Sequence, residues 1–151
     1  MRVSAKADYA VRAAIELATA HDDPVTAEIV AQRQEIPVQF LQKIFHELSR
    51  ARLVVSQRGP EGGYRLARPA DEVTVADILR AVEGPLAAVR GQPPESLQYT
   101  GAAAPLQEVW IALRTNVRAV LEGVTLAELA GSHLPRQIVR LAGEPESWVT
   151  R

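Results

Sequence analysis

Apolar residues recur at helical spacing in three stretches near the start of the chain, and each stretch follows a residue suited to begin a helix. Ser4 precedes an apolar stripe over residues 5–19, and Thr26 precedes a short amphipathic stretch over 27–34. Ile36-Pro37 precedes a third stretch, in which apolar side chains alternate with surface Gln, Lys and Arg. The pattern predicts three helices, of which the second and third form a helix-turn-helix.

The periodicity changes immediately after the third helix. LVVSQR at 53–58 and YRLAR at 64–68 are short runs with β-branched and aromatic residues, and a Gly-Pro-Glu-Gly-Gly loop separates them. Such runs around a glycine-rich turn indicate a β-hairpin. A helix-turn-helix followed by a basic hairpin is the outline of a winged helix-turn-helix, so the predicted fold class is mainly α with a two-stranded β-wing.

The second half of the chain is again helical. Thr74 and Asp77 form a capping-box pattern for a helix that Gly84 closes, residues 106–121 form the longest amphipathic stretch, and Thr125 with Glu128 caps a short helix ending near 131. Residues 91–105 lack periodicity and predict a loop or a disordered segment. Beyond 135 we expect one helical turn at 137–141 and a frayed tail from 143. The expected division is a winged-helix domain (1–84), a loop with dimerisation helices (85–131) and a weakly ordered tail (132–151).

Composition excludes several classes of function. The 151 residues contain no cysteine, which excludes a disulfide, a thiol switch and a Cys-ligated cluster. No apolar run approaches the roughly 20 residues of a membrane span, and the start lacks the apolar core of a signal peptide, so we expect a cytoplasmic chain with no membrane partner. Residues 1–70 hold ten Lys and Arg against eight Asp and Glu, whereas residues 71–151 hold seven against ten. This modest asymmetry is compatible with a DNA-binding front half.

The candidate DNA-binding residues fall into three groups. Amide and basic side chains on the third helix suit base edges in the major groove, a guanidinium beside a glycine-rich tip suits a narrow minor groove, and other polar or basic groups suit phosphates. The base-reading candidates are Gln39, Phe40, Gln42 and Lys43; the wing candidates are Arg58, Gly59, Gly62, Gly63 and Tyr64; the phosphate candidates are Ser4, Lys6, Arg50, Arg52 and Arg65. Two alternatives stay open, because Phe40 could instead join the core and Tyr64 could pack under the wing.

Metal and catalytic sites find no support in the sequence. The three histidines His21, His46 and His133 lie far apart, and position 50, where a zinc-binding helix would need a second histidine after His46, is Arg. No catalytic triad, P-loop or dinucleotide fingerprint occurs. We therefore expect neither an enzyme nor a metal site.

The wing block RGPEGGY, with MRVSAKADYAVRA before it and VTVADILRAVEG and LQEVWIAL after it, resembles the Rrf2 family of bacterial winged-helix regulators over about residues 1–131. The resemblance implies a homodimeric DNA-binding transcription factor whose long helix crosses its partner. That helix also carries more apolar surface than a small domain could cover alone. The expected interface residues are Leu106, Val109, Trp110, Leu113 and Val117.

The chain departs from the cluster-binding members of that family. Their three cysteines correspond to Gly91, Leu97 and Ala104 here, and a histidine ligand found in some members corresponds to Gln107. None of these side chains is a usual cluster ligand, so we expect no cofactor and an effector that is either a small molecule or a protein. The loop at 91–105 is then either the regulatory element or an inert remnant.

Together these features predict a homodimeric regulator of transcription, acting as a repressor at a two-fold symmetric operator without an iron–sulfur cluster. The alternative is a winged-helix module that docks other proteins and does not bind DNA. Salt-dependent binding to duplex DNA separates the two.

Overall fold

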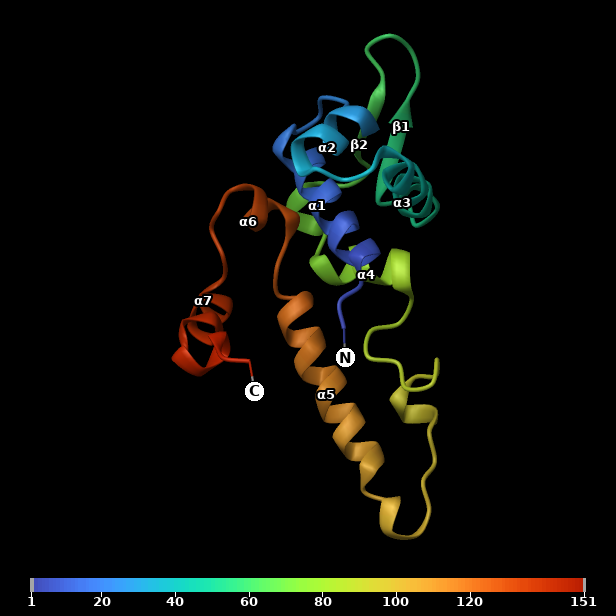
Figure 1. Ribbon diagram of the computed structural model, residues 1–151, viewed down its shortest axis with the longest axis vertical. Helices are drawn as coiled ribbons and strands as arrows, with labels where there is room; N and C mark the ends of the chain where they lie inside the picture. Colours follow the sequence, from blue (N-terminus) through green and yellow to red (C-terminus); the bar gives the residue numbers. More distant parts are fainter. Residues whose placement is uncertain (1, 151) are drawn as a thin grey trace.

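The computed structural model describes residues 2–150, and in it one long helix projects away from the other helices and the hairpin (Figure 1). The described residues are mainly helical, with a single two-stranded antiparallel sheet, which confirms the predicted fold class. No helix among them has the length and apolarity needed to cross a membrane. The elements are α1 (Ala5–Thr19), α2 (Ala27–Gln34), α3 (Val38–Arg50), β1 (Val54–Gln57), β2 (Gly63–Leu66), α4 (Val75–Glu83), α5 (Leu106–Leu121), α6 (Leu126–Ala130) and α7 (Arg136–Gly143), with short 3-10 turns η1 (Ala70–Glu72), η2 (Pro94–Ser96), η3 (Gly101–Ala103) and η4 (Pro145–Trp148).

The helices begin where the capping residues predicted. The Ser4 hydroxyl accepts a hydrogen bond from the Ala7 amide at 3.0 Å, and the Thr26 hydroxyl accepts one from the Ile29 amide at 3.3 Å. Both predicted capping boxes are formed, at the N-termini of α4 and α6. Each box satisfies amide groups that the first helical turn leaves without intrahelical partners.

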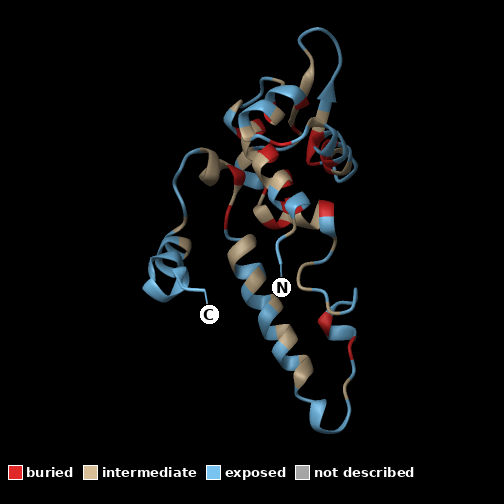
Figure 2. Cartoon of the chain, in the orientation of Figure 1, coloured by how far each residue is buried: buried red, intermediate tan, exposed pale blue. Residues whose placement is uncertain are grey.

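One hydrophobic core supports the recognition surface (Figure 2). It joins Leu17 of α1, Val30 of α2, Phe45 of α3 and Ile78 of α4, all at most 1% exposed. Leu126 of α6 belongs to the same core, since the chain returns after α5 and packs α6 against α1. The side chains of α6 thereby help to hold α1, and through α1 the helix-turn-helix.

The turn between α2 and α3 fixes the angle of the helix-turn-helix. Glu35 ends α2 in the left-handed region (φ 54°, ψ 44°) and Ile36, 3% exposed, inserts into the core. Pro37 then precedes α3, where the missing amide costs nothing because the first helical turn has no intrahelical acceptor for it. This local geometry leaves one face of α3 on the core and the other in solvent.

The wing is a short hairpin pinned at its base. β1 and β2 pair from Val54 with Leu66 to Gln57 with Gly63. A Cβ atom at Gly63 would lie 2.7 Å from the carbonyl carbon of Val25, so glycine is what lets the segment before α2 approach. The Val25 and Tyr64 backbones then exchange two hydrogen bonds of 2.8 Å. The base of the wing is thereby fixed to the helical core, and only its tip is free.

Of the two alternatives expected for residues 91–105, a loop or a disordered segment, the structure has the loop, with two short 3-10 turns in it. It contains η2 and η3, and Leu97 is only 2% exposed. The Gln107 amide donates to the carbonyl oxygen of Leu97 at 2.6 Å, the Trp110 indole N–H donates to the Tyr99 hydroxyl at 3.1 Å, and Arg114 pairs with Glu95. These partners lie far apart in sequence, so hydrophobic periodicity could not reveal them.

A short set of polar contacts ties the base of α5 to the winged-helix domain. The amides of Val75 and Leu126 donate to the carbonyl oxygens of Val124 and Val73 at 3.0 and 2.9 Å. Glu122 at the end of α5 pairs with Arg80 of α4 and, at 3.0 Å, with Arg118. The hydrogen bond from Arg80, followed by that from Arg118, lowers the pKa of Glu122. The orientation of α5 is therefore coupled to α4.

The C-terminal segment also differs from the sequence prediction. Where one helical turn and a frayed tail were expected, the structure has α7 and the turn η4. The hydroxyl of Ser147 and the indole N–H of Trp148 donate to the carbonyl oxygens of Leu141 and Ala142, which closes η4 back on α7. The sequence lacks a side-chain N-cap before this helix, so the usual start signal was missing.

Candidate nucleic-acid interface

The exposed face of α3 carries most of the side chains predicted to read bases. Leu41, Ile44, Phe45 and Leu48 bury the opposite face. The solvent-exposed residues on the outer face are Gln39, Gln42, Lys43, His46 and Arg50. The sequence analysis considered His46 only as a metal ligand and did not include it among the DNA-binding candidates. It lies three residues after Lys43 and four after Gln42, so it shares their face of the helix.

Two aromatic candidates are placed differently from the amides. Phe40 follows Gln39 by one residue and so points about 100° further around the helix. Its ring, 49% exposed, meets Tyr9 of α1 edge-on at 6.3 Å between centroids. Tyr64 stacks on Phe45 with the ring centroids 4.2 Å apart. Tyr64 is thus a packing residue under the wing, while Phe40 lies at the border between α1 and the outer face of α3.

Arg58 stands at the free end of the wing. It follows β1 directly and is exposed, and Gly59 beside it has a φ of 111°, in the region that favours glycine. A Cβ at Gly62 would overlap the carbonyl oxygen of Gln57, so the tip can close only with glycine there. The two glycines remove side chains from the tip, leaving a narrow arm whose Arg58 side chain can enter a groove.

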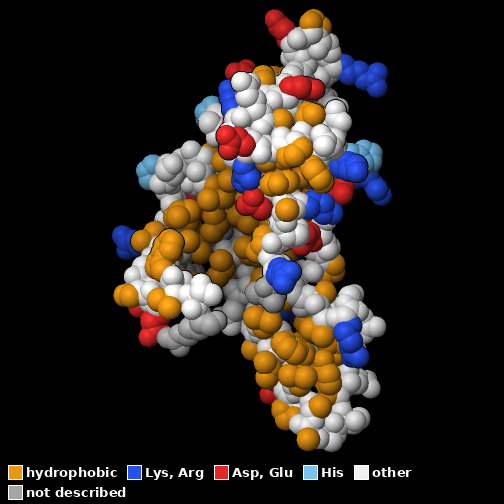
Figure 3. Space-filling view, in the orientation of Figure 1, with side chains coloured by type: hydrophobic (Ala, Val, Ile, Leu, Met, Phe, Trp, Pro, Cys, Tyr) orange, Lys and Arg blue, Asp and Glu red, His pale blue; other side chains and the backbone are white. Residues whose placement is uncertain are grey.

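The cations of α3 and the wing differ from those of α4 and α5 in their pairing. Arg80, Arg114 and Arg118 all form ion pairs with carboxylates on or near α5. Within residues 2–150, no carboxylate pairs with the cations on α3, after it or on the hairpin: Lys43, Arg50, Arg52, Arg58, Arg65 and Arg68. Blue side chains project from this edge in Figure 3. Cations without a carboxylate partner, placed along α3 and the hairpin, are suited to bind the phosphates of a DNA backbone.

The two N-terminal phosphate candidates are engaged within the protein. The Ser4 hydroxyl caps α1 and also bonds to Glu83 at the end of α4. Lys6 pairs with Glu47 of α3 at 3.2 Å. A phosphate contact by either residue would compete with these bonds. The cations of α3 and the wing can bind phosphate without first breaking an ion pair within the described residues.

The expected dimerisation helix shows an open apolar stripe. No residue of α5 is fully buried; Val109 is 55% and Leu113 36% exposed. Leu106 and Val117 are half-buried on the same stripe. Trp110 lies at its edge, half-buried, with its indole N–H turned to Tyr99 of the loop. The structure thus places Trp110 between the loop and the open stripe.

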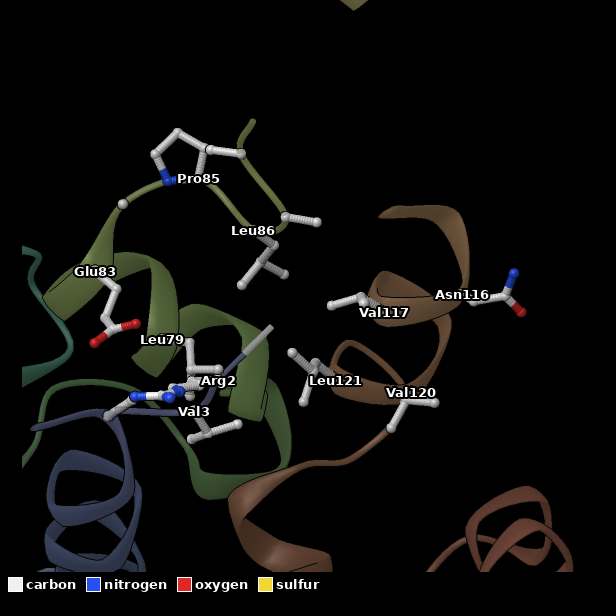
Figure 4. Close-up of a pocket in the computed structure, with 14 residues that line it drawn as sticks. Arg2, Val3, Leu79, Glu83, Pro85, Leu86, Asn116, Val117, Val120 and Leu121 are labelled. Carbon is white, nitrogen blue, oxygen red and sulfur yellow. The ribbon is translucent and has the colours of Figure 1, made fainter. Parts of the chain in front are cut away.

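A cavity of about 580 Å³ lies between the winged-helix domain and α5. Figure 4 shows Leu79, Leu86, Val117 and Leu121 directed into it, whereas Asn116 points away. Arg2 and Glu83 are the charged residues among those that line it. The lining suits an apolar group, and the position at the junction of α4 and α5 is one where an occupant would affect the angle between them.

Comparison with known proteins identifies the family. Residues 3–132 match the family model Rrf2, described as an iron-dependent transcriptional regulator. The chain belongs to the Rrf2 family. Rrf2 relatives are named as transcriptional regulators, which confirms the prediction that the chain is not an enzyme.

Three relatives show how far the similarity extends. A protein of Mycobacterium tuberculosis (strain H37Rv), named provisionally as an HTH-type transcriptional regulator, is 50% identical over 145 residues, 95% of this chain and 90% of its own. The structure of CymR, the global cysteine regulator of Bacillus subtilis, matches with a TM-score of 0.74 and 34% identity over 87% of this chain and 98% of its own. The T. potens IscR structure matches with a TM-score of 0.70 and 29% identity over 100% and 93%.

The residues of this Rrf2 chain do not fit an iron–sulfur cluster. The sequence has no cysteine, and residues 2–150 contain no group of three or more His, Asp or Glu side chains that could hold a metal. At the positions that resemble the ligand set, Leu97 is buried and Gln107 uses its amide on the carbonyl oxygens of the loop. The family description therefore does not extend to a thiolate-ligated iron site in this chain.

Proposed function

We propose that this Rrf2 protein is a homodimeric DNA-binding repressor that recognises a two-fold symmetric operator and works without an iron–sulfur cluster. The observation that carries the proposal is the set of unpaired cations on α3 and the wing, next to exposed amides on α3. Each protomer would place α3 in a major groove and Arg58 in the flanking minor groove.

The open stripe on α5 supports the dimer. Exposed Val109 and Leu113 would be covered by a second copy, and a two-fold axis through this helix would repeat the recognition surface. Half-sites about one helical turn apart, roughly 34 Å, or a multiple of it, match such a pair. A dimer seated on an operator that overlaps a promoter would exclude polymerase, which is the simplest form of repression.

The effector is expected at the junction of α4 and α5. The cavity there and the loop at 91–105 both border α5, so a small apolar molecule or a protein partner bound there would alter the spacing of the two α3 helices. An occupant changes DNA affinity only if it binds more tightly to one arrangement of the two α3 helices than to another.

The test is selection of bound fragments from the source genome with the purified protein, followed by binding isotherms at several salt concentrations. We expect a palindromic consensus and a log–log salt slope of about −0.9 per phosphate contact. Transcription from a template carrying that consensus should fall when the protein is added. Absence of salt-dependent binding to any duplex would favour a winged-helix module that docks proteins instead.

The absence of a cluster has its own measurement. Anaerobically purified protein should be colourless and contain neither iron nor sulfide in stoichiometric amounts, because no side chain in the loop can replace the missing thiolates. Stoichiometric iron and sulfide with intact operator binding would show that the family's cofactor is held in another way.

A further inference from the structure

The outer face of α3 carries one side chain of a type that changes charge near neutral pH, and this is His46. Of the three histidines in the chain, His46 is the one that α3 holds. It is exposed, and its imidazole has no ion pair or hydrogen bond within residues 2–150. Histidine, Lys and Arg side chains gather at the edge formed by α3 (Figure 3). Because histidine ordinarily changes its charge between about pH 5 and 8, the charge of this face can vary within that range.

No carboxylate of the described residues pairs with His46. Glu47 follows it directly but pairs with Lys6 of α1 at 3.2 Å. The charged groups nearest along its own face are Lys43 and Arg50, three residues before it and four after it. A negative partner for a charged imidazole must therefore come from outside the described chain.

The elements packed against α3 are α1, α2, α4 and β1. Their charged and titratable groups are Lys6, Tyr9, the pair Asp8–Arg12 and the pair Glu16–Arg33 on α1 and α2, Glu28 in the first turn of α2, Asp77 and Glu83 of α4, which accept hydrogen bonds from Thr74 and Ser4, and Arg80 of α4, which pairs with Glu122; β1 has none. Apart from Glu28, every carboxylate among them is engaged by a residue other than His46.

The place of His46 along α3 favours a phosphate over a base edge. The helix begins at Val38, so His46 lies about 12 Å further along its axis. Recognition helices contact base edges with their N-terminal residues, and the major groove is itself about 12 Å wide. With Gln39 and Gln42 at the bases, His46 would reach the edge of the groove, where the phosphates lie.

We propose that His46 is a proton-linked phosphate contact, through which each protomer takes up a proton when it binds the operator. The inference rests on the DNA-binding function proposed above and adds a form of regulation to it. The proton moves from solvent to the imidazole, and the resulting imidazolium donates a hydrogen bond to a phosphate oxygen. A phosphate nearby favours the charged imidazole over the neutral one. By reciprocity the operator is then bound more tightly as pH falls, and repression increases with acidity.

This link has a signature in the salt dependence of binding. A charged imidazole on a phosphate displaces counterions that a neutral imidazole leaves in place. The log–log salt slope of wild type should therefore be steeper at pH 6 than at pH 8, by up to about 0.9 for each His46 in contact and roughly 1.8 for a dimer. At fixed low salt, affinity for the operator should rise about tenfold or more between pH 8 and pH 6. A residue that only supports the fold would not change the number of counterions released.

Substitutions in the full chain assign the effect to one residue. His46→Gln is neutral at both pH values, so it should show the shallower slope at both. His46→Lys is charged at both, so it should show the steeper slope at both. His21→Gln and His133→Gln change the two histidines outside α3 and should keep the wild-type difference. Isotherms on the selected operator at several salt concentrations measure these slopes, and circular dichroism at both pH values checks that each variant is folded.

Single base-pair substitutions in the operator separate a phosphate contact from base reading. A phosphate carries no sequence information, so the difference between pH 6 and pH 8 should persist on every substituted operator. A difference that disappears with one base pair alone would overturn the phosphate contact and make His46 a base-reading residue.

The remaining outcomes separate this inference from the function on which it rests. If wild type binds the operator with the same salt slope at both pH values, or if His46→Gln keeps the wild-type difference, the proton link at His46 is wrong and DNA binding stands. If wild type shows no salt-dependent binding to duplex DNA at either pH, the DNA-binding proposal fails and the proton link fails with it.

Discussion

At the residue scale, Gln42 is the clearest candidate for base recognition. Its exposed amide on the outer face of α3 can offer one donor and one acceptor to an adenine. Gln42→Ala should therefore lower affinity by about 1–3 kcal/mol on the best operator and much less on an operator altered at the contacted base pair. Isotherms on matched and single-substituted operators measure this difference. An equal loss on every sequence would move Gln42 to the phosphate-contacting class.

Arg58 should behave in the opposite way. It lies on the free tip of the wing without a carboxylate partner among the described residues, so we expect its contribution to DNA binding to be electrostatic and to depend on groove width. Arg58→Ala should weaken binding to all operator variants and reduce the salt slope by about one counterion. A changed base preference with an unchanged slope would contradict this assignment, and Arg68→Ala, another unpaired cation beyond β2, is the control for loss of charge alone.

The sequence predicted which face of α3 is exposed better than it predicted what individual side chains contact. The amides and cations of α3 are exposed as expected, because helical periodicity alone decides which face leaves the core. Periodicity could not show that the Tyr64 ring packs in the protein, because its stacking partner Phe45 lies 19 positions earlier in the chain. It also overlooked His46, although the spacing from Gln42 was enough to place it on the same face.

At the element scale, prediction succeeded wherever the signal was local. The two capping boxes and the glycines of the wing determine their elements from within about four residues, and α1, α2 and α5 have the predicted bounds. It failed where order depends on distant partners. The loop before α5 is held by Gln107, and α7 begins without a side-chain hydrogen bond at its N-cap, so no local start signal marks it.

The loop provides a prediction at this scale. Gln107→Ala removes the amide that donates to the carbonyl oxygens of Pro94, Glu95 and Leu97, so the backbone at 94–99 should open more often. Hydrogen exchange of amides in this segment should become at least about tenfold faster, because each lost bond to a half-buried carbonyl costs on the order of 1 kcal/mol. Asn116→Ala, on the same helix but away from the loop, is the control. Unchanged exchange would mean that Leu97 and Pro94 hold the loop by packing alone.

If the loop is regulatory, Gln107→Ala should also change operator affinity or its response to an effector. If it is an inert remnant, exchange will rise while both remain as in wild type. The two results decide between the alternatives that the sequence left open.

At the scale of the whole molecule, the structure joins a DNA-binding part to an assembly helix through one junction. Backbone bonds between residues 73–75 and 124–126, together with the Arg80–Glu122 pair, fix the base of α5 to α4. Because the folded-state pKa of Glu122 is lowered, the stability this pair contributes is present above the unfolded pKa and is lost as pH falls through the folded one. At neutral pH, α5 should therefore move with the recognition surface.

In the dimer proposed above, that coupling links dimerisation to DNA binding. Leu113→Glu puts a charge in the middle of the open α5 stripe without touching α3 or the wing, so it should convert the dimer to monomer at micromolar concentration while leaving circular dichroism unchanged. A monomer contacts one half-site, so affinity for the full operator should fall by about 100-fold or more while the salt slope drops to about half. Sedimentation and isotherms on whole and half operators measure both quantities in one protein. Full affinity retained by a monomeric variant would show that each winged-helix domain reads its site alone, and that α5 serves another purpose than spacing the two recognition helices.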